Sequence, residues 1–181
     1  RINNNYKMNE SIVKYWGEYD SSIIFCEDKY VDSPYIAEFY NTISGFSYVL
    51  VGLYYLNTSI YKTAISQILL GIGTIMLHGT LRWYGQLADE LAMVTMMFMY
   101  IKEVQQISYN WLVLLYVLYA ISFDLHAIFS LIFGVLLVYQ YLLANCLAKS
   151  SGLHQKVDYY KYTMILGTLC LGIDHIFCVK N

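Results

Sequence analysis

Apolar runs of membrane-span length follow one another along most of this chain. A transmembrane helix needs about 20 consecutive, mainly apolar residues. Hydrophobic residues make up 58% of the 181 residues and charged residues only 13%, whereas soluble domains are about half apolar and about a quarter charged. Short polar breaks divide the apolar part into six runs: residues 39–60, 64–81, 86–104, 109–123, 125–147 and 159–178. The sequence therefore predicts an all-α fold, a polytopic membrane bundle of about six transmembrane helices.

The first 38 residues differ from the rest because they are polar and mixed in composition. Ile23, Ile24 and Phe25 give this segment apolar surface to bury, so we expect a cap or an interfacial helix rather than a linker. We therefore divide the chain into an N-terminal cap, 1–38, and a transmembrane bundle, 39–181. The net charge of −2 comes without the clustered basic face of a nucleic-acid-binding protein, so no nucleic-acid partner is expected.

An even number of spans returns the chain to the side on which it started, and this predicts where the ionisable residues gather. The ends of the apolar runs place one set on the N-terminal side: His78, Asp89, Glu90, Asp124, His126, Asp174 and His175. The opposite side receives most lysines outside the N-terminal tail: Lys62, Lys102, Lys149, Lys156 and Lys161. By the positive-inside rule the lysine-rich side is cytoplasmic. We therefore expect an integral membrane protein with a non-cytoplasmic N-terminus.

A candidate reactive stretch runs from Thr74 to Glu90. Thr74 and His78 are one helical turn apart and share a face. Ionisable groups at membrane depth are costly and mark candidate functional sites. A histidine can bind zinc, the carboxylate of Asp89 can orient water or take its proton, and a hydroxyl can donate to an oxyanion. The competing explanation for Asp89 and Glu90 is that acidic residues are favoured at a helix N-terminus.

Two of the four cysteines fall on the N-terminal side of the predicted bundle. Cys26 precedes the first span and Cys178 ends the last one. A disulfide between them is compatible with the oxidising, non-cytoplasmic side of a membrane. Two unpaired, buried cysteines are the alternative, because cysteine is a common buried residue.

Six short motifs together resemble the alkaline ceramidases, in the order and near the spacing of that family. They are YWG (15–17), CEDKY (26–30), YIAEFYNTISG (35–45), TxxxH (74–78), QLADEL (86–91) and IDHIFC (173–178), and the resemblance covers nearly all of residues 15–178. It implies an intramembrane zinc hydrolase of seven helices, related to the adiponectin receptors and housed in endomembranes of the ER or Golgi. Such an enzyme cleaves the amide of ceramide to sphingosine and a fatty acid.

The resemblance also implies roles for individual residues. His78 matches the first of three zinc histidines, Thr74 stands where the family has a serine that polarises the amide carbonyl, and Asp89 matches the aspartate near the zinc-bound water. Cys26 and Cys178 match the family's disulfide pair.

The other two zinc histidines of the family belong to an HxxxH motif in a seventh helix, which we expect to lie beyond Asn181 or to be absent. His126 and His175 are alternative zinc ligands on the same side of the membrane as His78. Alternatively they are ordinary helix-end groups, satisfied by the neighbouring Asp124 and Asp174.

A calcium site is the second feature that the resemblance implies, and here the chain departs from the family. Glu27 and Glu38 match two acidic ligands, but Ile24 and Lys29 replace an aspartate and an asparagine. Calcium needs several oxygen ligands and gains affinity from their charge. We therefore expect no calcium, and predict that the Lys29 ammonium pairs with Glu27 or Glu38 where the ion would sit.

Two functions follow from these motifs. The first is hydrolysis of ceramide, a membrane sphingolipid, provided that the zinc site is complete. The alternative is a catalytically inactive protein of the same fold, which serves as a structural or lipid-binding subunit of a membrane complex and packs other subunits beside its sixth helix. A receptor or transporter built on this scaffold has less support.

Overall fold

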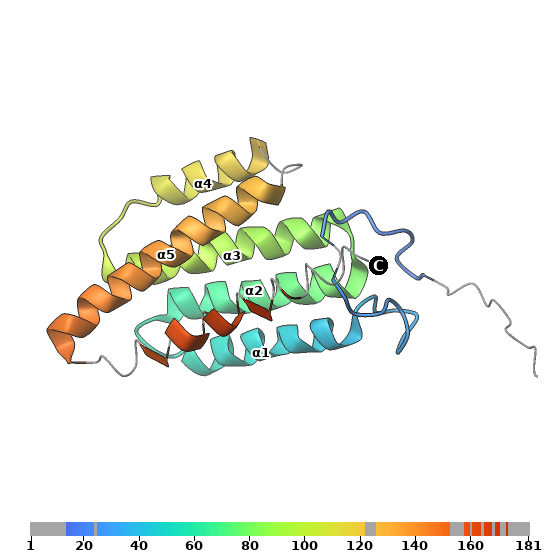
Figure 1. The fold of residues 1–181 in the computed structure, drawn as a ribbon, viewed down its shortest axis with the longest axis horizontal. Helices are drawn as coiled ribbons and strands as arrows, with labels where there is room; N and C mark the ends of the chain where they lie inside the picture. Colours follow the sequence, from blue (N-terminus) through green and yellow to red (C-terminus); the bar gives the residue numbers. More distant parts are fainter. Residues whose placement is uncertain are drawn as a thin grey trace, which may run out of the picture.

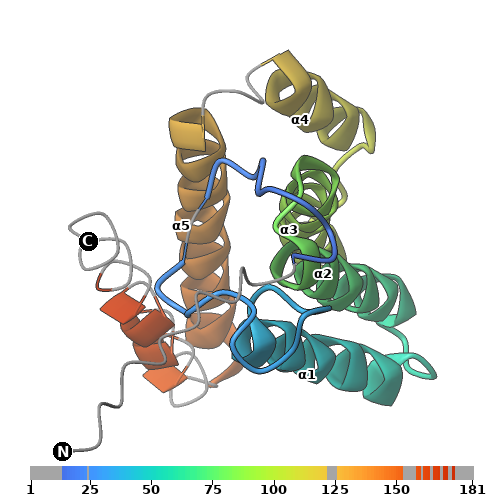
Figure 2. The same cartoon turned by 90° about the vertical axis from the view of Figure 1, so that its right-hand side faces the viewer.

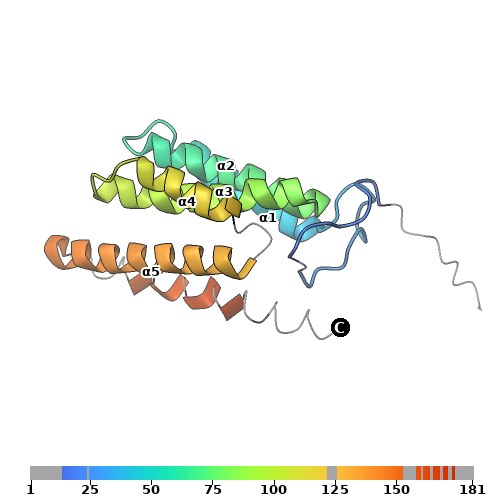
Figure 3. The same ribbon diagram turned by 90° about the horizontal axis from the view of Figure 1, so that it is seen from above.

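The regular structure of this protein is helical wherever the computed structural model describes it, at residues 14–23, 25–121, 126–152 and, in part, 158–173. In chain order the helices are α1 (Phe39–Tyr55), α2 (Tyr61–Thr80), α3 (Trp83–Val104), α4 (Asn110–Ile121) and α5 (His126–Ser151). The described residues from 158 to 173, red in Figure 1, are helical as well, and Figures 2 and 3 show them beside α5. The predicted all-α membrane bundle is confirmed.

Helix α2 occupies the centre of a row, with α1 on one side and α3 on the other (Figure 2). Helices α4 and α5 both pack against α3. Seen from above, α5 lies in a second layer next to the row of α1 to α4 (Figure 3). Phe133, Leu136 and Leu137 of α5 pack against a buried cluster that includes Met96 and Met97 of α3.

Two glycines bring α1 and α2 into backbone contact. A Cβ added at Gly71 would lie 2.8 Å from the carbonyl oxygen of Gly45, and one added at Gly45 would lie 3.2 Å from the carbonyl oxygen of Gly71. Helices in lipid associate mainly through close packing of such small residues, because lipid supplies no hydrophobic force between them. The contact therefore fits a bundle assembled in a membrane.

The outer surface of the bundle is apolar. Within the described residues, α2 and residues Ile128–Ala148 are long and apolar enough to cross a membrane, with 61% and 6% of their respective spans buried. Helix α1 also exposes large apolar side chains: Tyr40, Ile43, Phe46, Leu50 and Leu53. Contiguous apolar surface of this extent is rare on soluble monomers. Such a surface is typical of a membrane protein.

An irregular N-terminal segment crosses the end of the bundle where α1 begins, α2 ends and α3 begins (Figure 1). Its backbone is bonded to the end of α2: Ala37 N–H donates to Gly79 O at 3.0 Å and Asp20 N–H to Leu81 O at 3.2 Å. Tyr30 and Ala37 of this segment form a small buried apolar cluster with Leu81, the residue after α2. The described residues before α1 are not helical, so the interfacial-helix alternative is wrong for them.

Helix α3 begins at Trp83, three residues before the predicted start at 86. The cause is a tertiary contact, since the Asp20 carboxylate accepts the N–H of Trp83 at 2.6 Å and pairs with Arg82 at 2.9 Å. An acidic side chain on free N–H groups stabilises a helix start. Asp89 and Glu90 consequently lie well inside the helix rather than in its first turn, so the helix-start explanation for them is wrong.

The remaining helix boundaries differ from the predicted spans by a few residues. Helix α1 ends at Tyr55 rather than 60, and α2 begins at Tyr61 rather than 64, so the connection occupies residues 56–60 instead of 61–63. Helix α5 continues to Ser151, past the predicted end at 147, and stops before Gly152, whose φ of 71° is the left-handed conformation that terminates helices. The polar connection that was predicted to start at residue 149 therefore starts only after Ser151.

Candidate functional site

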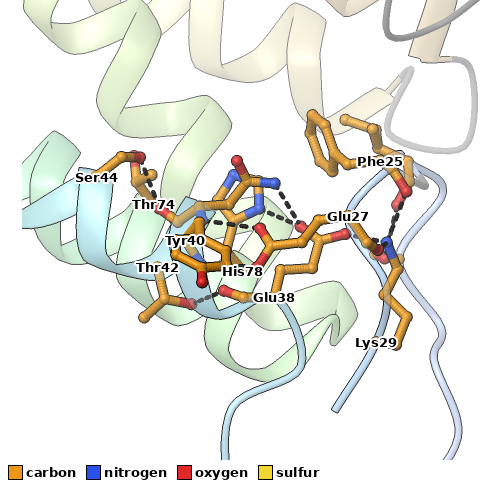
Figure 4. A network of polar contacts seen from close by, with 12 residues as sticks. Phe25, Glu27, Lys29, Glu38, Tyr40, Thr42, Ser44, Thr74 and His78 are labelled. Carbon is orange, nitrogen blue, oxygen red and sulfur yellow. Dashed lines mark hydrogen bonds and ion pairs between the residues drawn. The ribbon is translucent and has the colours of Figure 1, made fainter. Parts of the chain in front are cut away.

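His78 and Glu38 form a buried polar contact at the capped end of the bundle (Figure 4). His78 lies in the last turn of α2, and its Nδ1 is 2.5 Å from Oε2 of Glu38, the residue immediately before α1. The Glu38 side chain is completely buried, and the Phe25 ring packs on the imidazole with centroids 4.6 Å apart. The backbone N–H of Glu38 also donates to the His78 carbonyl oxygen at 2.9 Å, so the pair is held through main chain and side chains.

The Glu38 contact determines which nitrogen of His78 can bind a ligand. Burial raises the pKa of the Glu38 carboxyl, but hydrogen bonds from His78 and Lys29 outweigh burial and hold that pKa below its ordinary value. An ionised carboxylate only accepts hydrogen bonds, so Nδ1 of His78 must donate. In a neutral imidazole, a proton on Nδ1 leaves Nε2 with its lone pair, which is the arrangement of a metal-binding histidine supported by a carboxylate.

Lys29 supplies the counter-ion of Glu38. Its ammonium contacts Oε1 of Glu38 and donates to the carbonyl oxygens of Phe25 and Glu27, both at 2.6 Å. The predicted pairing of Lys29 with a neighbouring glutamate is thus confirmed for Glu38. The Glu27 carboxylate has another task, since it accepts the N–H groups of Tyr40 at 2.7 Å and Asn41 at 2.9 Å at the start of α1.

Thr74 and Asp89 join α2 to α3 one turn away from His78. Thr74 Oγ1 lies 2.6 Å from Asp89 Oδ1 and 3.0 Å from the Leu70 carbonyl oxygen, and both side chains are buried. A hydroxyl has one proton to donate, and the shorter contact assigns it to Asp89. Gly73 allows this approach, because a Cβ there would lie 2.7 Å from Asp89 Cα. The structure therefore gathers Thr74, His78 and Asp89 at one end of the bundle, as the sequence predicts.

A second buried network surrounds Glu90, and sequence reasoning missed its partners. The Glu90 carboxylate accepts Gln86 Nε2–H at 2.9 Å and the Tyr119 hydroxyl of α4 at 2.6 Å. Gln86 continues to the N-terminal segment, where it exchanges two hydrogen bonds with Ser22 at 2.6 and 2.7 Å. The four-residue spacing of Gln86 and Glu90 could have predicted their contact, because residues four apart on a helix are neighbours. The contacts with Tyr119 and Ser22 depend on tertiary packing.

Zinc chemistry requires about three protein ligands, and His78 fits one of them. Among the residues that the structure describes, no three histidine, cysteine, aspartate or glutamate side chains converge on one point. His126 begins α5 at the same end of the bundle (Figure 1), but its side chain lies outside the described part. His175, Asp124, Asp174, Cys178 and Ile24 lie outside the described residues too. The alternative ligands His126 and His175 and the Cys26–Cys178 disulfide therefore remain predictions.

Comparisons with known proteins agree on one family. A family model described as Ceramidase matches residues 17–181. An alkaline ceramidase of Arabidopsis thaliana is 28% identical over 195 residues, which cover 94% of this chain and 75% of that protein. Alkaline ceramidase 3 of Mus musculus is 27% identical over 194 residues, or 91% of this chain and 70% of the mouse protein. An alkaline ceramidase of Saccharomyces cerevisiae is 38% identical over 93 residues, or 46% of this chain and 29% of the yeast protein.

Proposed function

This chain belongs to the alkaline ceramidase family, and from that membership we propose that it hydrolyses the amide bond of ceramide to sphingosine and a fatty acid. The observation that carries the proposal is the Thr74–Asp89 hydrogen bond, at 2.6 Å, one helical turn from His78. A hydroxyl, a carboxylate and an imidazole with a free Nε2 make up the polar groups that metal-assisted amide hydrolysis requires. Their burial at one end of an apolar bundle suits a lipid substrate whose amide lies close to the membrane surface.

His78 would hold a zinc ion through Nε2. The other ligands would come from residues outside the described part, with His126 and His175 as the candidates in this chain, or from chain beyond Asn181. When bound, zinc polarises a carbonyl and lowers the pKa of a water molecule to about 7. Nothing in this assignment uses calcium, because the Lys29 ammonium pairs with Glu38.

Asp89 is the candidate base in this proposal, and Thr74 is the residue that orients it. A carboxylate within hydrogen-bond reach of the attacking water can take its proton. Thr74 fixes the Asp89 carboxylate by donating to Oδ1. While that bond exists, the hydroxyl cannot also polarise the substrate carbonyl, so its first task is to position Asp89. Donation to the developing oxyanion becomes available only when Thr74 Oγ1 turns away from Asp89.

The orientation in the membrane is a further part of the proposal. Lys62 and Lys102 lie in the terminal turns of α2 and α3 that are remote from His78. The positive-inside rule assigns that end to the cytoplasm, so residues 1–38 would cap the bundle, 39–181, on the non-cytoplasmic side of an endomembrane. The test uses a cysteine at exposed Tyr35, with the free Cys146 and Cys170 replaced by serine and with Cys26 and Cys178 left intact. This cysteine should stay unreactive to an impermeant reagent when only the plasma membrane is permeabilised, and react once the endomembranes are opened as well. Reaction with the endomembranes still closed would contradict this orientation.

Hydrolysis is tested with purified protein from the full reading frame, reconstituted with zinc and a ceramide that carries a fluorescent acyl chain. We expect release of the labelled fatty acid, loss of release in His78→Ala and Asp89→Asn, and full release in the control Gly134→Ala. The control is neutral because a Cβ at Gly134 meets no atom within 4 Å. Absence of turnover in the folded, zinc-supplied parent would reject the hydrolase and favour the inactive lipid-binding subunit, which ceramide binding without turnover would identify.

A further inference from the structure

Glu38 links a lysine to the candidate zinc ligand. Its side chain has no exposed surface, and its two oxygens have different partners: Oε1 contacts the Lys29 ammonium, and Oε2 contacts Nδ1 of His78. Oε2 also accepts a 3.2 Å hydrogen bond from the Asn41 side chain. A buried carboxylate is strongly destabilising without a positive partner. Lys29 is the positively charged partner that this buried carboxylate has on the side opposite the ring.

The Lys29 ammonium has all of its hydrogen bonds satisfied at this position. It has three donors, and three oxygens accept them: the carbonyls of Phe25 and Glu27, each at 2.6 Å, and Oε1 of Glu38. The side chain is only 13% exposed. Figure 4 shows the ammonium between the loop that carries Phe25 and the glutamates. An exposed surface lysine would not be enclosed in this way, so the ammonium is a built-in cation of the site.

The backbone around Glu38 makes the linkage rigid. Glu38 N–H donates to His78 O at 2.9 Å, Ala37 N–H to Gly79 O at 3.0 Å, and Tyr30 N–H to Ala37 O at 2.9 Å. These bonds fix the carboxylate relative to the last turn of α2. The Phe25 ring, which packs on the imidazole, belongs to the same loop whose carbonyls bind Lys29. Ring, carboxylate and ammonium are consequently positioned as one unit.

We propose that Lys29 and Glu38 are positioning residues that hold the His78 ring with its Nδ1–H on Glu38, so that Nε2 is the nitrogen left for a metal, with the Lys29 ammonium acting as a covalently attached cation. The inference deepens the proposed function and depends on it for the metal, but the ring orientation itself needs no metal. Partners of this kind, beyond the metal's own ligands, change metal affinity by about 10- to 100-fold.

The first measurement is made without metal. Heteronuclear spectra of the full-length, chelator-treated protein labelled with ¹⁵N-histidine report which ring nitrogen carries the proton, and His78→Gln identifies the signal. We expect the Nδ1–H form in the parent, and its loss in Lys29→Ala and in the near-isosteric Glu38→Gln. Lys14→Ala is the matched control, because Lys14 pairs with the exposed Glu18 in the same segment. The Nε2–H form in the parent, or an unchanged signal in Lys29→Ala, would refute the proposal.

The second measurement is the zinc dissociation constant, obtained by competition with a chromophoric chelator. Lys29→Ala and Glu38→Gln should bind zinc about 10- to 100-fold more weakly than the parent, and Lys14→Ala should bind it equally well. Unchanged zinc affinity in a folded Lys29→Ala protein would overturn the positioning role while leaving hydrolysis intact. A parent that shows the Lys29-dependent Nδ1–H form but binds no zinc would instead overturn the proposed function. The positioning of the His78 ring by Lys29 and Glu38 would still be supported.

Discussion

The hydroxyl of Thr74 on α2 donates to the carboxylate of Asp89 on α3 across 2.6 Å, fifteen residues apart in sequence. Both side chains are buried where the two helices pack most closely. This bond gives Asp89 a fixed orientation inside an apolar bundle. It also makes the hydroxyl a support for the candidate base, in addition to the carbonyl-polarising role that the family resemblance implies.

Removing the Thr74 hydroxyl should therefore lower kcat more than it changes KM. In Thr74→Val the side-chain shape is kept but Asp89 loses its donor, and a misplaced catalytic group can cost about 100-fold in rate. Thr74→Ser retains the hydroxyl and should stay within a few-fold of the parent. Steady-state kinetics with fluorescent ceramide measure both variants. A Thr74→Val enzyme with parental kcat would show that Asp89 needs no support from this residue.

Enlarging Gly73 should separate the two residues without changing either of them. A Cβ at this position would lie 2.7 Å from Asp89 Cα and 2.8 Å from Asp89 N, so Gly73→Ala must push α3 away from α2. Overpacking of this kind costs about 1–3 kcal/mol, and the Thr74–Asp89 bond should lengthen with loss of activity. Thermal unfolding and ceramide turnover are compared with Gly134→Ala, where the added methyl meets open space. Equal behaviour of the two alanine variants would contradict the close helix contact.

The Glu90 network should contribute stability through Tyr119. In Tyr119→Phe the Glu90 carboxylate loses the 2.6 Å hydrogen bond from α4, and loss of a donor to a buried polar group costs about 1–3 kcal/mol. The matched control is Tyr139→Phe, which removes a 2.7 Å bond to Gln105 at an exposed position. The free energy of unfolding in detergent should fall clearly for the first variant alone. If both variants unfold alike, burial of Glu90 does not depend on Tyr119.

Asp20 should stabilise the start of α3 from a distance in sequence. Asp20→Ala removes the acceptor of Trp83 N–H and the partner of Arg82, and a lost helix cap costs about 1 kcal/mol. We expect faster amide hydrogen exchange in the first turn of α3, with little change in α2. Glu18→Ala, which removes only the exposed pair with Lys14, serves as the control because such surface pairs contribute about 0–1 kcal/mol. Unchanged exchange at the start of α3 would contradict the capping role.

Local features of the sequence were enough to predict the helical fold and the place of the candidate site at one end of the bundle. Apolar runs separated by polar breaks are a property of consecutive residues, so the helices could be drawn to within a few residues of their observed ends. Thr74 and His78 could be assigned to one face because helical spacing places residues four apart together. The pairing of Lys29 with a glutamate was predicted from the family resemblance, which places Lys29 among the acidic positions of a calcium site; only the structure shows that the partner is Glu38.

Contacts between segments far apart in sequence were decided only by the tertiary structure. Asp20 moves the start of α3 to Trp83, and Glu38 contacts His78, forty residues further along the sequence. Neither contact leaves a periodic trace, because the partner of a polar group is chosen by which backbones pack side by side. The same reason explains why Tyr119 on Glu90 was not foreseen. The sequence by itself determined which residue types could do the chemistry, and packing at the capped end of the bundle determined what each of them bonds to.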